Sequence, residues 1–510
     1  MKGFLSRLTL EVSLLRMRLT SSNTMTYVSK KNEVYLKVET EQHIHKELSE
    51  YFCFDVPNAK FMPHYKKRVW DGKIRLYSPG TGEIYVGLYD YLQQFFINKG
   101  YKYTVKLDDN YGIPEEEEDY VTPESTASFV RSLGLPFAAR DYQLRGIYQA
   151  LKSRRKLLLS PTGSGKSLII YALVRWYLQK GLEVLIIVPT TSLVEQMYKD
   201  FETYGWKASA YCHKIRAGKE KYVDNPVVIS TWQSIYKEPK SFFARFDAVI
   251  GDEAHLYKAK SLSGILTKML DTKYRVGLTG TLDGLQTHQL VLEGLFGSVN
   301  QITKTKDLQK KGHLTPLKVN VILLKHGWVP FDYYQQEIEY LCMHERRNKF
   351  ISKLALDTVG NTLILFNYVE KHGEPLYELI NSYNTKRRVF FIHGGIDTEE
   401  REEARRITEL EKDAIIVASY GTFSTGINIR NLHNVIFASP SKSRVRNLQS
   451  IGRVLRKGEN KSQATLYDIA DDCTKGSYHN YTFRHLIERM KIYESEEFDY
   501  EVTKVRFKND

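Results

Sequence analysis

Apolar and polar residues follow one another along this chain in two series of short apolar runs separated by helical patterns. In the first series, five runs have the length and composition of buried strands: 156–159, 184–188, 227–231, 248–250 and 275–279. In the second series, five more runs follow: 363–366, 389–393, 415–419, 435–439 and 464–469. Strands that alternate with helices favour a parallel sheet covered by helices. The pattern therefore predicts an α/β fold with two similar parallel-sheet units in tandem.

The region before these units has a mixed pattern. Residues 34–38 alternate like a strand, and residues 43–52 carry apolar side chains at helical spacing. Cations and aromatic rings interleave over residues 65–77 around Asp71-Gly72, a pair typical of tight hairpin turns. We expect a small α+β N-terminal domain over residues 25–107, with a hairpin at this point.

The side chains of the expected hairpin have chemistry that suits nucleic acid. Lys67, Arg68 and Lys73 could neutralise phosphates, and the ring of Trp70 could stack on a base. In the alternative interpretation the hairpin is only a solvated surface, with Trp70 and Tyr77 packed inward.

Composition divides the remainder of the chain. Residues 108–126 are acidic with little apolar content, and we interpret them as a linker. The first tandem unit then takes residues 127–311, which end in a lysine-rich connector over 304–311, and the second takes residues 312–472. The last segment is residues 473–510. From Gly476 onward it carries apolar residues at helical spacing, interleaved with cations: Phe483, Leu486, Ile487, Met490 and Tyr493, among Arg484, Arg489 and Lys491. We expect an amphipathic helix packed on the second unit, with a contact to DNA or a partner as the alternative.

The strongest chemical signal is Ser-Pro-Thr-Gly-Ser-Gly-Lys-Ser at residues 160–167, between a predicted strand and a predicted helix. Glycines let the backbone turn so that successive N–H groups face phosphate oxygens, and the helix adds its positive end. Lys166 would reach the β and γ phosphates of ATP, and the Ser167 hydroxyl would bind Mg²⁺. The stricter form of the motif has glycine at the position of Ser160. The expected phosphate-binding residues are Pro161, Thr162, Gly163, Ser164, Gly165, Lys166 and Ser167.

A second signal, Asp252-Glu253-Ala254-His255, directly follows the predicted strand that ends at residue 250. Asp252 at a strand end can hold Mg²⁺, and Glu253 can polarise the attacking water as a general base. Hydrolysis of ATP needs little covalent help from protein, since positioning and charge neutralisation do most of the work. Together with the phosphate loop, this pair predicts a hydrolytic site.

Other segments are weak signals when taken singly. The amide of Gln143, in Arg140-Asp141-Tyr142-Gln143, could pair with the adenine edge, although an ordinary helix start explains the segment equally well. Leu278-Thr279-Gly280-Thr281 could couple the nucleotide to movement, or could be a plain turn after a strand. Hydroxyls that follow two other strands suit either a sugar-phosphate backbone or helix capping. The nucleic-acid contacts expected there are Thr190, Thr191, Thr231 and Gln233.

In the second unit, Gln449-Ser450-Ile451-Gly452-Arg453-Val454-Leu455-Arg456 places Arg453 and Arg456 on one helix face. An arginine that reaches across a cleft can stabilise charge on the transferred phosphoryl group. Such a pair is usually no more than surface charge. Because the first unit carries the two motifs described above, we interpret the arginine pair as part of the ATP site.

Bulk properties favour a globular chain that binds a polyanion. The 510 residues suffice for about three or four domains. The formal net charge of +14 favours a nucleic-acid partner, with a merely basic surface as the alternative. No apolar run reaches membrane-spanning length, and the four separated cysteines indicate neither a zinc site nor a disulfide framework. Residues 1–24 are basic and lack a long apolar core, so we expect a disordered extension or an upstream start codon, with a transit-like leader as the alternative.

Taken in order, these motifs resemble those of superfamily 2 helicases, over residues 137–469. A closer likeness, spanning nearly all of residues 25–507, is to recombination helicases of T-even-like phages, the UvsW type. It rests on these phrases: Trp70-Asp71-Gly72, Val188-Pro189-Thr190-Thr191, Thr231-Trp232-Gln233, and residues 417–421, 423–427 and 451–457.

The resemblance implies two RecA-like motor domains that share an ATP site in the cleft between them, and a nucleic-acid-binding N-terminal domain. ATP and Mg²⁺ are the implied cofactors. Gln143 would contact adenine alongside Arg140, and Gly426 and Asn428 would lie at the nucleotide. Three further catalytic residues would act from the second unit: Gln449, Arg453 and Arg456, with Arg456 as the arginine finger.

The implied activity is ATP-dependent unwinding or branch migration of forks, junctions, D-loops and RNA:DNA hybrids in phage recombination, repair and replication. The implied partners are branched double-stranded DNA, single-stranded DNA, and recombination or single-strand-binding proteins. We expect a monomer in the host cytoplasm, without membrane contact. An RNA helicase, and an ATP-switched nucleic-acid-binding protein without processive unwinding, are the alternatives.

Overall fold

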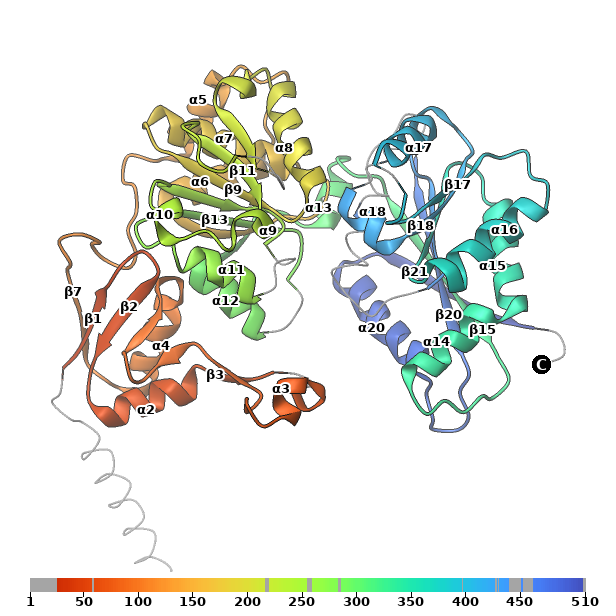
Figure 1. Ribbon diagram of the computed structural model, residues 1–510, viewed down its shortest axis with the longest axis horizontal. Coiled ribbons are helices and arrows are strands. Elements are labelled where there is room, and N and C mark those ends of the chain that lie inside the picture. The colour runs from red at the N-terminus through yellow and green to blue at the C-terminus, as the bar shows by residue number, and fades with distance from the viewer. Residues whose placement is uncertain are drawn as a thin grey trace, which may run out of the picture.

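The computed structural model describes residues 25–507, except 57–58, 216–219, 255–258, 283–285, 397, 427–428, 430, 440–450 and 453–461. The described residues form an N-terminal unit and two lobes, each built on a sheet of its own. Figure 1 shows the N-terminal unit below the first lobe and the second lobe beside the first. The predicted α/β class with two parallel sheets in tandem is confirmed.

The N-terminal unit is a mixed sheet with strand order β5-β6-β2-β1-β7. Its main elements are β1 (Thr26–Lys30), β2 (Tyr35–Glu39), α2 (Gln42–Tyr51), β5 (Tyr77–Ser78), β6 (Glu83–Tyr85), α4 (Tyr89–Lys99) and β7 (Tyr103–Lys106). Helices α2 and α4 pack on the sheet through apolar side chains such as Leu48 and Leu92, which are fully buried. The strand and the helix predicted in this region are confirmed as β2 and α2.

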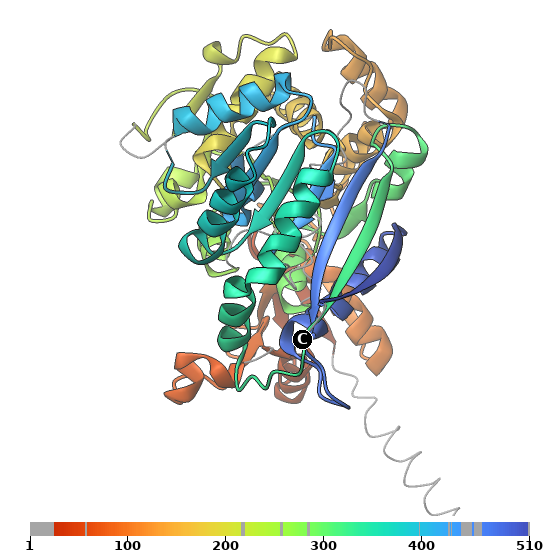
Figure 2. The same ribbon diagram turned by 90° about the vertical axis from the view of Figure 1, so that its right-hand side faces the viewer.

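The predicted hairpin around Asp71-Gly72 is wrong. β4 (Lys73–Arg75) pairs with β3 (Cys53–Asp55) and not with the residues just before Asp71. Between these strands the chain makes a long excursion that contains a short 3-10 turn and α3 (Pro63–Lys66). Gly72 has φ of +79°, and an added Cβ there would lie 2.9 Å from Ala59 Cβ. Glycine at this position therefore lets the backbone pass close to Ala59 within the excursion. We call residues 59–73 the arm, which projects from the N-terminal unit in Figures 1 and 2.

The first lobe is a seven-stranded parallel sheet with order β10-β11-β9-β12-β13-β8-β14. The five predicted strands appear as β8, β9, β11, β12 and β13, and most of their side chains are buried because helices cover both faces. The strands are β8 (Arg155–Leu159), β9 (Val184–Val188), β10 (Cys212–Ile215), β11 (Val227–Thr231), β12 (Ala248–Gly251), β13 (Tyr274–Thr279) and β14 (Val299–Gln301). The helices are α5 (Pro123–Ser132), α6 (Asp141–Ser153), α7 (Lys166–Gln179), α8 (Thr191–Thr203), α9 (Trp232–Ile235), α10 (Lys240–Phe243), α11 (Ala259–Leu266), α12 (Gln286–Phe296) and α13 (Thr305–Lys310).

The second lobe has a parallel sheet of the same size, with order β17-β18-β16-β19-β20-β15-β21. The strands are β15 (Leu317–Lys325), β16 (Thr362–Phe366), β17 (Val389–Ile392), β18 (Ile415–Ser419), β19 (Asn434–Phe437), β20 (Ala464–Asp472) and β21 (Asp499–Arg506). The helices are α14 (Tyr334–Met343), α15 (Glu345–Asp357), α16 (Glu374–Ser382), α17 (Thr398–Leu410), α18 (Tyr420–Gly426) and α20 (Tyr481–Ser495). The sequence analysis did not predict β21, because most side chains of this edge strand are exposed and form no apolar run.

The helix predicted after residue 476 is confirmed as α20, which packs on β20. Leu486 is buried as expected, but Ile487 is 41% exposed and Arg489 is fully buried. Asp468 explains this exchange, since its two carboxylate oxygens accept hydrogen bonds from the Arg489 guanidinium at 2.8 and 2.9 Å. A guanidinium can be buried when a carboxylate pairs with it in this way.

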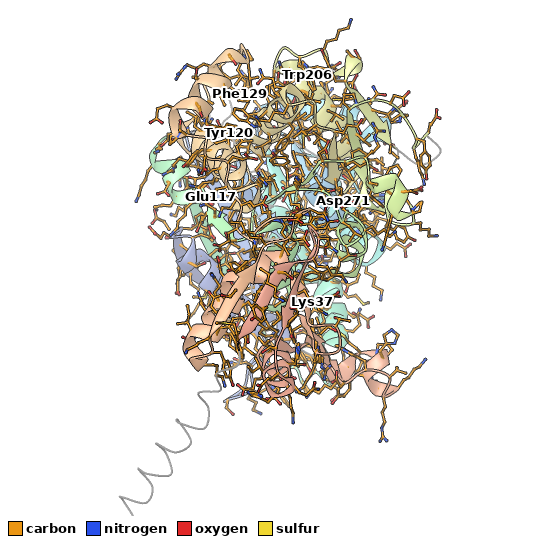
Figure 3. All side chains as sticks on the ribbon, turned by 90° about the vertical axis from the view of Figure 1, so that its left-hand side faces the viewer. Lys37, Glu117, Tyr120, Phe129, Trp206 and Asp271 are labelled. Carbon is orange, nitrogen blue, oxygen red and sulfur yellow. The ribbon has the colours of Figure 1, made fainter. Side chains whose placement is uncertain are left out.

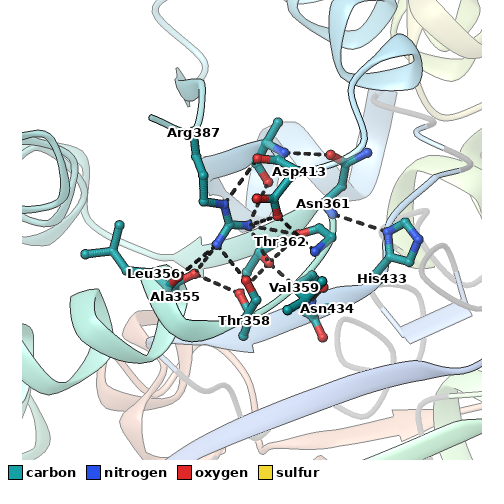
Figure 4. Close-up of polar contacts among 12 residues, drawn as sticks. Ala355, Leu356, Thr358, Val359, Asn361, Thr362, Arg387, Asp413, His433 and Asn434 are labelled. Atoms are coloured by element: carbon teal, nitrogen blue, oxygen red, sulfur yellow. Dashed lines mark hydrogen bonds and ion pairs between the residues drawn. The ribbon is translucent and has the colours of Figure 1, made fainter. Parts of the chain in front are cut away.

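Another arginine secures the end of α15. The Arg387 guanidinium donates to the carbonyl oxygens of Ala355, Thr358 and Gly360 at 2.7 to 2.8 Å and lies 3.1 Å from the Asp413 carboxylate (Figure 4). Carbonyl groups at a helix end have no partner within the helix. Arg387 satisfies them and ties α15 to the start of the neighbouring strands.

The N-terminal unit is docked on the first lobe by polar contacts. The Glu33 N–H donates to the Leu270 carbonyl at 2.8 Å, and the Arg155 guanidinium lies 3.0 Å from the Glu33 carboxylate. In the segment that follows the unit, the Tyr111 hydroxyl donates to Asp271 at 2.8 Å, and Figure 3 shows Asp271 between the body of the first lobe and the sheet that carries Lys37. The arm is therefore attached, through this unit, to the lobe that carries the phosphate loop.

We expect a buried histidine to make the second lobe sensitive to acid. His372 is fully buried, with Nδ1 at 2.7 Å from Ser439 Oγ and Nε2 at 3.2 Å from Asn348 Oδ1. Burial, and then the nearby Arg347 guanidinium, lowers the pKa of His372 to about 3. The unfolded chain takes up this proton near pH ~6.5 and the folded chain does not, so stability is lost as the pH falls below that value.

We expect His372→Gln to remove this part of the acid sensitivity, because the amide has no proton to gain in this range. Between pH 7 and pH 5 the parent chain should lose about 2 kcal/mol through His372, and the variant should not. Urea unfolding of both chains at the two pH values measures the difference. Equal losses in the two chains would contradict the prediction.

Candidate active site

The phosphate loop lies between the end of β8 and the start of α7, as predicted. Gly163 and Gly165 have φ of +85° and +82°, a region that glycine adopts without strain. Ser160 is fully buried, and its hydroxyl oxygen lies 2.5 Å from that of Ser164 across the turn. Serine at the position of the stricter motif's first glycine therefore closes the turn with a hydrogen bond.

The segment around Gln143 forms a wall of this loop. Gln143 Oε1 accepts from the Arg140 N–H at 2.9 Å, and Gln143 Nε2 donates to the Ser164 carbonyl at 3.0 Å. The Arg140 guanidinium donates to the Tyr142 hydroxyl at 2.8 Å, which in turn donates to the same Ser164 carbonyl at 2.7 Å. A Cβ added at Gly165 would collide with the Gln143 amide, so this glycine also serves close packing.

Asp252 and Glu253 directly follow β12 and lie beside the loop. Lys166 Nζ donates to Glu253 Oε1 at 2.8 Å. Glu253 has φ of +49°, and backbone strain of this kind in a residue other than glycine is concentrated at functional sites. Asp252 is 7% exposed, and burial, followed by the Glu253 carboxylate, raises its pKa to about 7. His255 lies outside the described residues.

The side chains beside the loop fit Mg²⁺. Ser167 offers a hydroxyl and Asp252 a carboxylate, and Mg²⁺ prefers such hard oxygen donors, completed by phosphate oxygens and water. A cation would also relieve the repulsion between the neighbouring Asp252 and Glu253 carboxylates. Within the described ranges no three His, Cys, Asp or Glu side chains form a metal cluster.

The second lobe reaches the phosphate loop through Ile451 and Gly452. Ile451 is buried, and a Cβ added at Gly452 would lie 2.6 Å from Thr162 Cβ. A cavity of about 450 Å³ lies between the lobes at this contact. Its lining includes Pro161, Thr162, Gly280, Thr281, Ile451 and Gly452. The two lobes therefore meet at the loop.

Four of the predicted nucleotide-site residues cannot be placed. Gln449, Arg453, Arg456 and Asn428 lie outside the described residues, whereas Gly426 is the last residue of α18. Leu314, shortly after α13, also approaches the loop, because a Cβ added at Gly163 would lie 2.8 Å from Leu314 Cδ2.

Known families match this chain in three consecutive segments. Residues 28–108 match the N-terminal region of the DNA helicase UvsW, residues 136–284 the res subunit of type III restriction enzymes, and residues 345–458 the helicase conserved C-terminal domain. The ATP-dependent DNA helicase uvsW of Enterobacteria phage T4 is 35% identical over 499 residues, which cover 91% of this chain and 96% of the T4 protein. This chain belongs to the UvsW family of ATP-dependent DNA helicases.

Solved structures agree with membership of the UvsW family. A crystal structure of T4 UvsW has a TM-score of 0.50 and 32% identity, and the match covers 94% of this chain and 99% of that chain. A fragment of a putative HsdR subunit of a type I restriction enzyme from Vibrio vulnificus has a TM-score of 0.56 at 18% identity, over 85% of this chain and 76% of that chain, and so shares the fold. The predicted superfamily 2 helicase, driven by ATP, is confirmed.

The predicted nucleic-acid contacts of this UvsW-family helicase form two groups. One predicted group of contacts lies at the ends of the neighbouring strands β9 and β11: Thr190, Thr191, Thr231 and Gln233. Thr190 caps α8 by accepting from the Leu193 N–H at 3.4 Å, and Thr231 is 4% exposed with its hydroxyl on Ser234. These two hydroxyls serve the capping and turn roles that were the alternative interpretation, whereas Thr191 and Gln233 are exposed.

The other predicted group of contacts lies on the arm. Lys67, Arg68 and Lys73 are exposed, and Trp70 is half-buried with its Nε1 donating to the Lys73 carbonyl at 2.8 Å. Tyr77, just beyond the arm, is buried, so only this one of the two rings packs fully inward. The arm also exposes apolar side chains that the sequence analysis did not single out: Phe61, Tyr65 and Val69. Within the described residues no helix has the length and apolar content to span a membrane.

Proposed function

We propose that this helicase uses ATP and Mg²⁺ to unwind or branch-migrate forks, junctions and D-loops and to remove RNA:DNA hybrids, in phage recombination, repair and replication. The contact of Gly452 with Thr162, beside the Lys166–Glu253 pair, carries the proposal. It supports an ATP site that both lobes complete. The match of the T4 DNA helicase along almost its whole length supports DNA over RNA as the substrate.

The proposed roles of the residues follow from their chemistry. Lys166 would hold the β and γ phosphates, and Glu253 would orient the attacking water and take its proton. Gln143 and Arg140 would line the side of the phosphate loop at which adenine binds. Mg²⁺, when bound by Ser167 and Asp252, supplies positive charge at the phosphate oxygens. Five residues would complete the site from the second lobe: Gly426, Asn428, Gln449, Arg453 and Arg456.

The lobes would couple hydrolysis to movement. ATP would close the cleft, because Arg453 and Arg456 can meet the γ phosphate only when the second lobe approaches the first. Hydrolysis would remove that bridge and open the cleft. A strand gripped alternately by the exposed Thr191 and Gln233 of the first lobe and by the second lobe would then advance in steps.

We also propose the setting in which the helicase acts. It would act as a monomer in the host cytoplasm, on branched and single-stranded DNA, with recombination or single-strand-binding proteins as partners. Residues 25–107, 127–311 and 312–472 would be its three domains, joined in part by the acidic segment 108–126.

A panel of labelled substrates tests the proposed substrate class. Forks, four-way junctions, D-loops, RNA:DNA hybrids and RNA duplexes would be incubated with the full chain, with and without ATP. We expect ATP-dependent separation of the branched DNA and the hybrids, and little action on RNA duplex. Comparable unwinding of RNA duplex would favour an RNA helicase, and negligible hydrolysis in the presence of DNA would favour an ATP-controlled switch.

The arm should contribute to the salt dependence of DNA binding. Lys67→Gln with Arg68→Gln removes two exposed charges, and each lost phosphate contact should lower the slope of log affinity against log salt by about 0.9. The slope would be measured from fork binding at several salt concentrations. Hydrolysis of ATP without DNA should be unchanged.

A matched control removes the same charge elsewhere. Lys371→Gln with Arg406→Gln takes two cations from the second lobe, where each pairs with a carboxylate, at 2.8 and 2.7 Å. This variant should keep the parent slope. If both double variants change the slope equally, net charge and not the arm is responsible.

A further inference from the structure

A tyrosine outside every motif touches the phosphate loop. The Tyr204 hydroxyl oxygen lies 2.8 Å from Ser167 Oγ. Tyr204 directly follows α8, and its backbone N–H donates to the Asp200 carbonyl at 3.1 Å. Ser167 is in the first turn of α7. The contact therefore joins the end of one helix to the start of another at the proposed Mg²⁺ ligand.

The position of the Tyr204 hydroxyl is set by packing. The side chain is 8% exposed. Its ring lies 5.1 Å from that of Tyr171, between centroids, and 5.8 Å from that of Phe137. Phe201 and Trp206 pack on Tyr171 in the same cluster. A ring held on several sides cannot swing away without opening the cluster, so its hydroxyl is a fixed partner for Ser167.

A fixed partner matters because a serine hydroxyl can rotate. It carries one proton and two lone pairs, and the proton turns toward whatever acceptor is in reach. A cation can use the oxygen only when a lone pair faces it and the proton points elsewhere. Either hydroxyl can donate in this pair. With the Tyr204 oxygen as the acceptor at 2.8 Å, the Ser167 proton has a defined direction.

We propose that Tyr204 is a positioning residue for Ser167, holding the serine hydroxyl with a lone pair turned to Mg²⁺. The inference rests on the proposed role of Ser167 as a metal ligand. Tyr204 itself touches neither nucleotide nor metal in this proposal, and its effect passes entirely through Ser167. Loss of the phenolic hydroxyl should therefore weaken binding of the magnesium–nucleotide complex and spare binding of nucleotide alone.

The test compares nucleotide binding with and without the metal. The full-length Tyr204→Phe chain would be titrated with a fluorescent ATP analogue, once with excess Mg²⁺ and once with EDTA. With Mg²⁺ the dissociation constant should rise about five- to tenfold, the size expected for one lost hydrogen bond. With EDTA it should stay at the parent value, and the thermal unfolding midpoint should show that the ring cluster is intact.

Three further chains sharpen the comparison. Tyr198→Phe removes a hydroxyl from α8 itself, at a ring that packs against the Lys214 ammonium group, and should match the parent under both conditions. Ser167→Ala should lose the advantage of Mg²⁺ at least as strongly as Tyr204→Phe. The double variant should bind no more weakly than Ser167→Ala alone, because the tyrosine acts through the serine.

Two outcomes would overturn the inference and leave the proposed function in place. In the first, Ser167→Ala shows the Mg²⁺-dependent loss and Tyr204→Phe binds like the parent. In the second, Tyr204→Phe loses affinity equally with Mg²⁺ and with EDTA, which would make the tyrosine a general support of the loop. If Ser167→Ala also keeps the full effect of Mg²⁺, the proposed metal-binding role of Ser167 fails as well.

Discussion

Lys166→Ala is expected to lower the rate of ATP hydrolysis about 10³-fold while DNA binding is retained. Lys166 is the one cation of the phosphate loop, and its ammonium group lies 2.8 Å from Glu253 beside the buried Asp252. A charge placed in such a water-poor site stabilises the developing negative charge on the phosphate far more than solvent does. The methyl group of alanine cannot replace it.

Steady-state hydrolysis with and without forked DNA measures this effect, and fork binding is measured in parallel. Lys199→Ala, an exposed lysine of α8 in the same lobe, serves as the matched control and should hydrolyse ATP at the parent rate. Hydrolysis by Lys166→Ala at close to the parent rate would mean that the ATP site lies elsewhere.

Glu253→Gln should also lower the rate of ATP hydrolysis, by about 10²- to 10⁴-fold. Its effect on ATP binding should differ from that of Lys166→Ala. The amide keeps the size of the side chain and can no longer accept a proton from the attacking water. It also releases Lys166 from a carboxylate that competes with phosphate oxygens for the same ammonium group. Affinity for ATP should therefore be equal to that of the parent or higher, whereas Lys166→Ala should bind ATP more weakly.

The two variants are separated by measuring nucleotide affinity and single-turnover hydrolysis on the same preparations. Glu253→Gln should hold ATP without cleaving it. Cleavage by Glu253→Gln at the parent single-turnover rate would show that another group activates the water. A parallel fall of affinity in both variants would instead show that Glu253 serves mainly to shape the loop.

Most motifs of the proposed ATP site could be recognised from the sequence. The residues of the phosphate loop are contiguous, and Asp252 and Glu253 come at the end of an apolar strand, so local order alone predicts their chemistry. Residues 184–188 and 227–231 were recognised for the same reason, since a buried strand leaves a continuous apolar run. The exposed edge strand β21 leaves no such run and was missed.

The predictions were wrong where a local sequence pattern is compatible with more than one tertiary arrangement. Asp71-Gly72 is typical of a hairpin, yet β4 pairs with β3, and the glycine serves a close approach to Ala59. Helical spacing placed Ile487 inward and Arg489 outward, and the buried Asp468 of β20 reversed that choice. In both cases the deciding partner is distant in the chain.

The amino-acid sequence by itself determined the succession of strands and helices and the chemistry of the phosphate loop, because both depend on neighbouring residues and their spacing. Only the tertiary structure decided that Tyr204 lies beside Ser167, that Gln143 walls the loop, and that Gly452 of the second lobe packs on Thr162. These contacts depend on how helices cross a sheet and how two lobes dock. Neither can be predicted from the spacing of apolar residues along the chain.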